Sequence, residues 1–173
     1  KMWSTMPWES RCAIFLKASE LLAGPRRAEI NASTMLNQSK TCHQAEIDSA
    51  CELIDFWRFN GDYCRQIYED LQPPVSPSSM WNSSEVRPLE GFVFSVTPFN
   101  FSSIAANLPS SAAIMGNTGV WKPSRNSYVS NYRLMKLMMD AGLPAGVINF
   151  IPGKASVVGD ICMSHPELAG VHF

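Results

Sequence analysis

Apolar side chains recur at the three-to-four-residue spacing of amphipathic helices through the first part of the chain. This spacing predicts helices over residues 7–22, 25–39 and 43–69, with Gly24-Pro25 separating the first two. The apolar stripes are expected to consist of Ala13, Leu16, Ala18, Leu21 and Leu22 in the first helix, and of Ile47, Cys51, Ile54, Phe56, Phe59, Tyr63 and Ile67 in the third. These helices should pack on a larger element.

The pattern changes after residue 71. Residues 72–84 are rich in proline and serine, so we expect a surface loop or arm there. From Gly91 onward, short apolar runs alternate with helical segments. Strands are expected at 91–96, 119–121, 147–151 and 169–173, and helices at 104–115, 128–141 and 155–163. Strands separated by helices imply right-handed crossovers and a parallel, doubly wound α/β sheet.

Composition narrows the class of protein without indicating a macromolecular partner. Apolar residues make up 46% of the chain and charged residues 17%, which is typical of a globular protein. A formal net charge of -1 gives no electrostatic reason to expect nucleic acid or a membrane. The five cysteines and three histidines match neither a zinc motif nor a disulfide framework. We therefore expect no metal site and a reducing compartment.

Candidate chemistry lies at the ends of the predicted strands, because ligands of open parallel sheets bind at the carboxyl edge. The first strand is followed by Thr97-Pro98-Phe99-Asn100-Phe101. The amide of Asn100 could there donate a hydrogen bond to a developing oxyanion. An asparagine between a strand and a helix also serves as a helix cap or turn residue, and that structural alternative stays open.

The second strand is followed by Lys122-Pro123-Ser124. The Lys122 ammonium could donate to a ribose hydroxyl or a phosphate. Alternatively, its stem packs at the strand end while the charge stays in solvent. No G-x-G-x-x-G follows the first strand, and the glycines around Lys154 lack phosphate-loop spacing.

The order of these motifs resembles the aldehyde dehydrogenase superfamily. The matching segments are Pro98-Phe99-Asn100, Gly116-Asn117, Trp121-Lys122-Pro123-Ser124, Ala141-Gly142-Leu143-Pro144 and residues 147–153. Within the superfamily, residues 14–18, 44–48, 52–60 and 89–93 look like the 1-pyrroline-5-carboxylate dehydrogenases of proline catabolism. The resemblance implies N-terminal helices (1–71), a loop or arm (72–90) and part of a Rossmann-like NAD-binding sheet (91–173), with the catalytic domain absent from the chain.

The resemblance also implies a reaction, which is the NAD-dependent oxidation of 1-pyrroline-5-carboxylate, as glutamate semialdehyde, to glutamate through a cysteine thiolate. It implies Asn100 as the catalytic oxyanion amide and Phe101 and Glu52 as substrate-binding residues, with Thr97, Pro98, Phe99, Lys122 and Ser124 as cofactor-binding residues. For Glu52, a solvated helix face or a helix-cap partner is an equal alternative. The resemblance further implies a small aldehyde as substrate, a homo-oligomer for the full-length protein, and the mitochondrial matrix, or otherwise the cytoplasm.

Three features depart from the family pattern. Arg125 stands where many relatives carry an acidic residue that accepts ribose hydroxyls. Residues 97–101, which contain Asn100, form the predicted asparagine loop. Pro109 falls inside the helix after this loop, where proline should kink and loosen the helix. Neither the family's nucleophilic cysteine nor its general-base glutamate has a counterpart here. A truncated, non-catalytic paralogue acting as a binding or assembly module therefore stays open, as does a dehydrogenase of another aldehyde.

Overall fold

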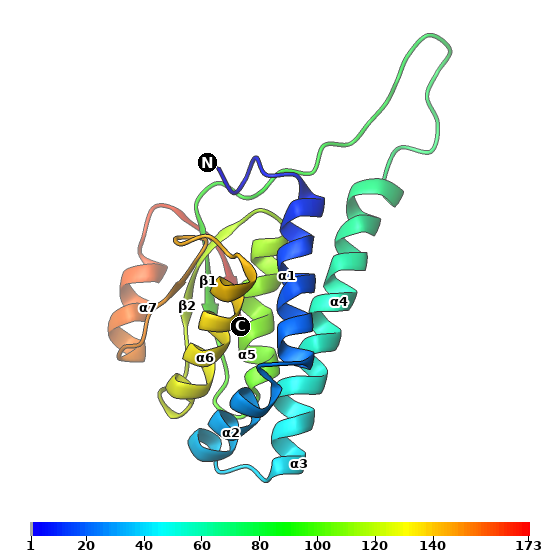
Figure 1. The fold of residues 1–173 in the computed structure, drawn as a ribbon. Coiled ribbons are helices and arrows are strands. Elements are labelled where there is room, and N and C mark those ends of the chain that lie inside the picture. The colour runs from blue at the N-terminus through cyan, green and yellow to red at the C-terminus, as the bar shows by residue number, and fades with distance from the viewer. Residues whose placement is uncertain (1) are drawn as a thin grey trace.

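A computed structural model describes residues 2–173 (Figure 1). Every predicted helix and strand is present, with ends within two residues of the prediction. The N-terminal part contains α1 (Trp8–Ala23), α2 (Arg27–Gln38), and one continuous helix made of α3 (Cys42–Ala45), η1 (Glu46–Cys51), α4 (Glu52–Arg65) and η2 (Gln66–Asp70). The C-terminal part contains β1 (Phe92–Val96), α5 (Ser102–Ile114), β2 (Thr118–Lys122), η3 (Arg125–Ser127), α6 (Tyr128–Ala141), β3 (Ile148–Phe150), α7 (Ala155–Met163) and β4 (Leu168–His172).

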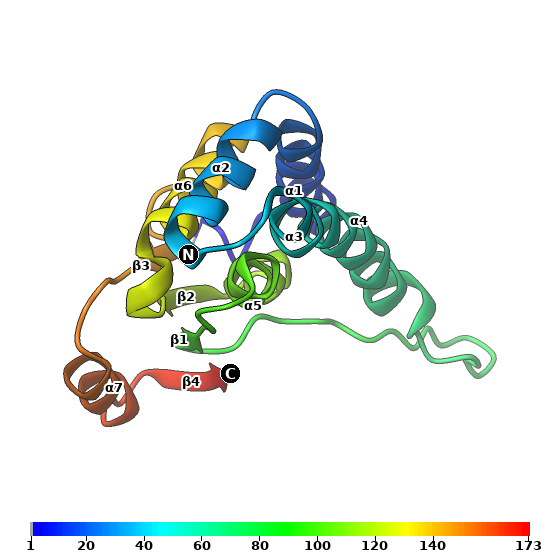
Figure 2. The ribbon, with the colours of Figure 1, turned by 90° about the horizontal axis from the view of Figure 1, so that it is seen from below.

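The four strands form one parallel sheet in the order β3-β2-β1-β4. The crossovers from β1 to β2 and from β2 to β3 progress in one direction, whereas the crossover from β3 to β4 returns past both strands. Right-handed crossovers then place α5 and α6 on one face and α7 on the other (Figure 2). The direction in which the chain adds strands to the sheet therefore reverses between β1 and β4. The ligand-binding crevice of such a sheet is expected at that point.

A second layer of helices covers α5 and α6. The helices α1, α2 and α4 pack on the side of α5 and α6 that faces away from the sheet (Figures 1 and 2). Small buried residues on α5, among them Ala105, Ala106 and Ser110, let its neighbours approach closely. Trp57 on α4 is fully buried and its Nε1 donates to Ser110 Oγ at 2.9 Å. This second layer therefore packs directly on α5.

Both ends of α5 are held by side chains from the N-terminal part. Arg11 Nε donates to the carbonyl of Ile114 at 2.8 Å, and Trp3 Nε1 donates to the carbonyl of Ala113 at 3.0 Å. These donors satisfy carbonyls that a helix C-terminus leaves without partners. At the other end, Gln38 Nε2 donates to Ser102 Oγ at 2.6 Å. The position of α5, and of the loop before it, thus depends on the N-terminal helices.

Parts of the predicted apolar stripes are wrong. Leu16 and Ile47 are each 42% exposed, and Phe59 is 56% exposed. Ala13 and Tyr63 are exposed as well. The buried faces instead consist of Arg11, Cys12, Phe15, Ala18, Ser19 and Leu22 on α1, and of Leu53, Ile54, Trp57 and Cys64 on α4. The hydrophobic pattern misses part of these faces because buried polar residues such as Arg11 and Ser19 belong to them.

Pro109 does not interrupt α5, which runs unbroken from Ser102 to Ile114. The proline is buried, and residues on either side of it are bound to α4. Asn60 Nδ2 donates to Asn107 Oδ1 at 2.8 Å, and Trp57 binds Ser110. These contacts keep the helix in place across the turn that lacks one backbone donor.

Residues 71–91 contain neither helix nor strand, and much of this segment extends away from the body of the molecule (Figure 1). Most of its apolar side chains are exposed, including Trp81 and Val75. The division at residues 71 and 90 stays a prediction, because the helices before the arm pack on the helices after it. Across residues 2–173, no helix combines the length and apolar content that crossing a membrane requires.

Candidate functional site

The loops after β1 and β2 meet at the carboxyl edge of the sheet. The parallel register sets Val96, the last residue of β1, beside Lys122, the last residue of β2. The backbone N–H of Thr97 then donates to the carbonyl of Lys122 at 3.2 Å. Trp121 Nε1 donates to Thr97 Oγ1 at 2.9 Å, and both side chains are buried. The two predicted site segments are therefore joined by a backbone and a side-chain hydrogen bond.

An apolar cavity of about 490 Å³ lies at the point where the sheet reverses direction. It is lined by Val96, Thr97, Pro98, Phe99, Ile104, Leu108, Ser124 and Phe173. Four of the residues predicted to bind a cofactor thus share one cavity. Its size and apolar lining are typical of small-molecule sites.

Lys122 does not line that cavity, but its side chain is unusual. The residue is only 7% exposed, and its ammonium forms no hydrogen bond or ion pair within residues 2–173. The stem of Lys122 is buried, while its Nζ stays accessible. An unpaired, accessible ammonium at a sheet edge suits a ligand that offers hydroxyl or phosphate oxygens. Arg125 lies three residues further on and is exposed.

Asn100 lines a second cavity, which adjoins the first. This polar cavity has a volume of about 560 Å³ and is lined by Asn37, Gln38, Ser39, Lys40, Phe99, Asn100 and Asn126. Phe99 lines both cavities. The side-chain amide of Asn100 has no hydrogen-bond partner in the described part of the chain, residues 2–173. A half-buried, unpaired amide donor is available to a ligand oxygen.

Phe101 and Glu52, predicted to bind substrate, line neither cavity. Phe101 precedes α5, where its carbonyl accepts from Ala105 N at 3.0 Å. Its ring centroid lies 4.6 Å from Lys40 Nζ. Glu52 Oε2 accepts from Ser103 Oγ at 2.7 Å, in the first turn of α5. The structure therefore brings both residues to the base of the asparagine loop.

The cysteines lie elsewhere, since none of the five lines either cavity. Cys12 and Cys64 are buried on the packed helices α1 and α4. A hydrogen bond between the two thiols, together with burial, raises the pKa of Cys12 far above its ordinary value. Burial also raises the pKa of the Cys162 thiol. A raised pKa keeps a thiol protonated and poorly nucleophilic. No cluster of three or more potential metal ligands occurs within residues 2–173.

The polar cavity contains residues that the sequence did not indicate, chiefly Gln38, Lys40 and Asn126. Lys40 lies in the turn between Ser39, which has a left-handed backbone (φ 54°), and Thr41, which caps α3. The capping box from Thr41 to Gln44 is visible in the sequence and marks a helix start. Nothing in the hydrophobic pattern shows that this turn lies beside Asn100.

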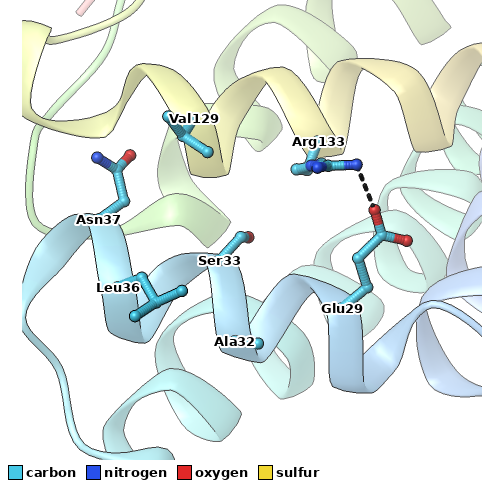
Figure 3. Close-up of a pocket in the computed structure, with 7 residues that line it drawn as sticks. All are labelled: Glu29, Ala32, Ser33, Leu36, Asn37, Val129 and Arg133. Carbon is cyan, nitrogen blue, oxygen red and sulfur yellow. Dashed lines mark hydrogen bonds and ion pairs between the residues drawn. The ribbon is translucent and has the colours of Figure 1, made fainter.

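Another cavity, of about 380 Å³, lies between α2 and α6 (Figure 3). It is lined by Glu29, Ala32, Ser33, Leu36, Asn37, Val129 and Arg133. The charges of Arg133 and Glu29 pair across it at 2.9 Å. None of the predicted catalytic, substrate-binding or cofactor-binding residues lines it, and it shares only Asn37 with the polar cavity.

The chain belongs to the Aldehyde dehydrogenase family, whose pattern it matches over residues 1–173. It is 47% identical over its whole length to a protein of Schizosaccharomyces pombe named probable delta-1-pyrroline-5-carboxylate dehydrogenase, and covers 31% of that protein. It is 45% identical, again over its whole length, to the human delta-1-pyrroline-5-carboxylate dehydrogenase, mitochondrial, of which it covers 30%.

Solved structures agree with this assignment. The structure of the Mycobacterium tuberculosis Delta-pyrroline-5-carboxylate dehydrogenase bound with NAD superposes with a TM-score of 0.97 at 53% identity. That superposition covers 99% of this chain and 32% of the solved chain. The chain thus spans less than a third of the length of the relatives it matches. The predicted fold, an α/β sheet of the aldehyde dehydrogenase NAD-binding domain with helices packed on it, is confirmed.

Proposed function

We propose that this chain supplies the cofactor-binding half and the oxyanion amide of an NAD-dependent 1-pyrroline-5-carboxylate dehydrogenase. The observation that carries the proposal is the pair of unpaired donors, Asn100 and Lys122, at the ends of adjacent strands. The three relatives described above, each named a pyrroline-5-carboxylate dehydrogenase, are 45% to 53% identical to the chain along at least 99% of its length. The substrate class is thus a small aldehyde with a carboxylate, oxidised to glutamate.

NAD fits the residues at the carboxyl edge. The Lys122 ammonium, held at the end of a buried stem, offers charge-assisted hydrogen bonds to ribose hydroxyls, and it has no partner within residues 2–173. The apolar cavity formed by Thr97, Pro98 and Phe99, with Ser124 beside it, would hold a flat, largely apolar part of the cofactor. When bound, NAD accepts the hydride that leaves the aldehyde carbon.

Asn100 would act on the substrate. When a nucleophile adds to an aldehyde, its carbonyl oxygen gains negative charge, and a donor fixed in advance stabilises that charge more than a mobile one does. The Asn100 amide is unpaired and faces a polar cavity, while its backbone is bound through Lys40. Phe101, beside it, would pack on the aliphatic part of the substrate. Glu52 would hold the loop through Ser103.

The remaining assignments are proposed by relationship. The human and Dictyostelium discoideum relatives are named mitochondrial, which favours the mitochondrial matrix for this protein. The nucleophilic cysteine and the general base would come from a part of the full-length protein outside this chain, since the five cysteines here lie away from both cavities. We also propose a homo-oligomer for the full-length protein.

The test is an assay of a full-length protein that contains this chain, incubated with NAD and 1-pyrroline-5-carboxylate. We expect NADH and glutamate to form in equal amounts, with propionaldehyde oxidised more slowly. A dehydrogenase of another aldehyde would instead oxidise an aldehyde such as propionaldehyde faster than 1-pyrroline-5-carboxylate. A non-catalytic paralogue would form no NADH with any aldehyde, and either result would overturn the proposed activity.

A further inference from the structure

Lys40 joins the N-terminal helices to the asparagine loop. Its ammonium forms an ion pair with Asp48 on the long helix and donates to the backbone carbonyl of Asn100. It also lies over the ring of Phe101, 4.6 Å from the centroid. One cation therefore contacts two consecutive residues of the candidate site at once.

The ion pair is largely shielded from solvent. The side chains of Lys40 and Asp48 are 12% and 18% exposed, whereas the other ion pairs between residues 2 and 173 have side chains that are at least 33% exposed. Screening by water is weaker for such a pair, and its geometry is better fixed. Asp48 thus anchors the ammonium against the loop.

Two further hydrogen bonds join the N-terminal helices to the residues that follow Phe101. Gln38 Nε2 donates to Ser102 Oγ at 2.6 Å, and Ser103 Oγ donates to Glu52 Oε2 at 2.7 Å. Together with Lys40, these side chains contact every residue from Asn100 to Ser103. Of Lys40, Gln38 and Glu52, only Lys40 binds Asn100 itself. Removing the Lys40 ammonium would therefore release the residue that carries the unpaired amide.

We propose that Lys40, anchored by Asp48, is a positioning residue that holds the Asn100 amide in its oxyanion-binding orientation. The inference rests on the proposed function of Asn100. An ammonium suits this place because it has three donors and no acceptor, and so can bind a carboxylate and a carbonyl together while its charge interacts with an aromatic ring. Lys40 itself would touch neither the reacting atoms nor the cofactor.

The test is a double-mutant cycle in a full-length protein that contains this chain. The rate of NADH formation at saturating substrate is measured for wild type, Lys40→Met, Asn100→Ala and the combined variant. Lys40→Met should lower the rate about 10- to 100-fold, as a misplaced catalytic group does, with little change in KM for NAD. In the Asn100→Ala background, the same substitution should change the rate by less than about twofold, because the two residues act through one interaction.

Two further variants separate positioning from folding. Arg27→Met removes a cation that pairs with Glu46 in the same helical layer and does not touch the loop. It should lower the melting temperature and leave the rate unchanged. Asp48→Asn keeps the ammonium but weakens its anchor, and should lower the rate in the same direction as Lys40→Met. If Lys40→Met does not fold, Asp48→Asn takes its place in the same double-mutant cycle with Asn100→Ala.

The outcomes are distinguishable. Equal losses from Lys40→Met in both backgrounds, or no loss in either, would overturn the positioning role while the function of Asn100 stands. An Asn100→Ala variant as fast as wild type would instead overturn the proposed oxyanion role, and the inference about Lys40 with it.

Discussion

Trp121 Nε1 donates a 2.9 Å hydrogen bond to Thr97 Oγ1, and this bond ties the end of β2 to the first residue after β1. Both residues are at most 5% exposed, so water does not compete for the bond. Thr97 also begins the loop that carries Pro98, Phe99 and Asn100. The indole thereby fixes the point from which the candidate site departs from the sheet.

Replacing Thr97 with valine keeps the shape of the side chain and removes the acceptor. The buried indole N–H then lacks a partner, which costs about 1–3 kcal/mol of unfolding free energy. Urea unfolding followed by tryptophan fluorescence measures this loss. Thr118→Val, at the other end of β2, is the control and should cost less than half as much. Equal losses of unfolding free energy from the two substitutions would show that the hydrogen bond between Trp121 and Thr97 does not stabilise the fold.

Lys122→Met tests the cofactor assignment. Loss of charge-assisted hydrogen bonds should weaken NAD binding about 10- to 100-fold, or ~1.4–2.7 kcal/mol. Calorimetric titration of NAD measures the change, and KM for the aldehyde should stay constant. Lys136→Met, on an exposed part of α6, is the matched control. Unchanged NAD affinity in Lys122→Met would exclude this ammonium from the cofactor site.

Glu46 provides a pH-dependent test of the helical layer. Hydrogen bonds from Arg27 and Asn31 hold the pKa of this carboxyl below its ordinary value of 4.5. A lowered folded-state pKa adds stability above the unfolded pKa, and that stability is lost as the pH falls through the folded value. Glu46→Gln should therefore lower the unfolding free energy at pH 7 by about 0.5–1 kcal/mol, as for other partly exposed ion pairs.

The difference between wild type and Glu46→Gln that is present at pH 7 should shrink as the pH falls below 4.5, and should vanish in acid below the lowered folded-state pKa, where the carboxyl is protonated in both states. Urea unfolding at the two pH values checks this. Glu85→Gln, on the exposed arm, should have no effect at either pH. A Glu46→Gln loss that persists unchanged in acid would show that packing, and not the charge, is responsible.

The fold could be predicted to a large extent because its signals are local. Strand and helix periods, together with breakers such as Gly142 and Pro144, define the elements without any tertiary information. The buried faces of α1 and α4 were predicted less well. Arg11 is buried because it caps the end of α5, and a hydrophobic pattern cannot anticipate a partner 103 residues away.

In the candidate site, too, some residues could be predicted from local sequence and others could not. Asn100 follows β1 and Lys122 ends β2, so the rule that ligands bind at carboxyl edges predicts both as site residues from sequence alone. Lys40 lies in a turn between two helices, 60 residues before Asn100. Its role depends on how the second helical layer sits on α5, which no local pattern determines.

The central claim is that Asn100 supplies the donor for the developing oxyanion. Single-turnover NADH formation by the Asn100→Ala variant of a full-length protein containing this chain tests it most directly. Asn82→Ala on the arm serves as the control. We expect a rate about 10²- to 10³-fold below wild type, with NAD affinity unchanged. A rate within about twofold of wild type would contradict it.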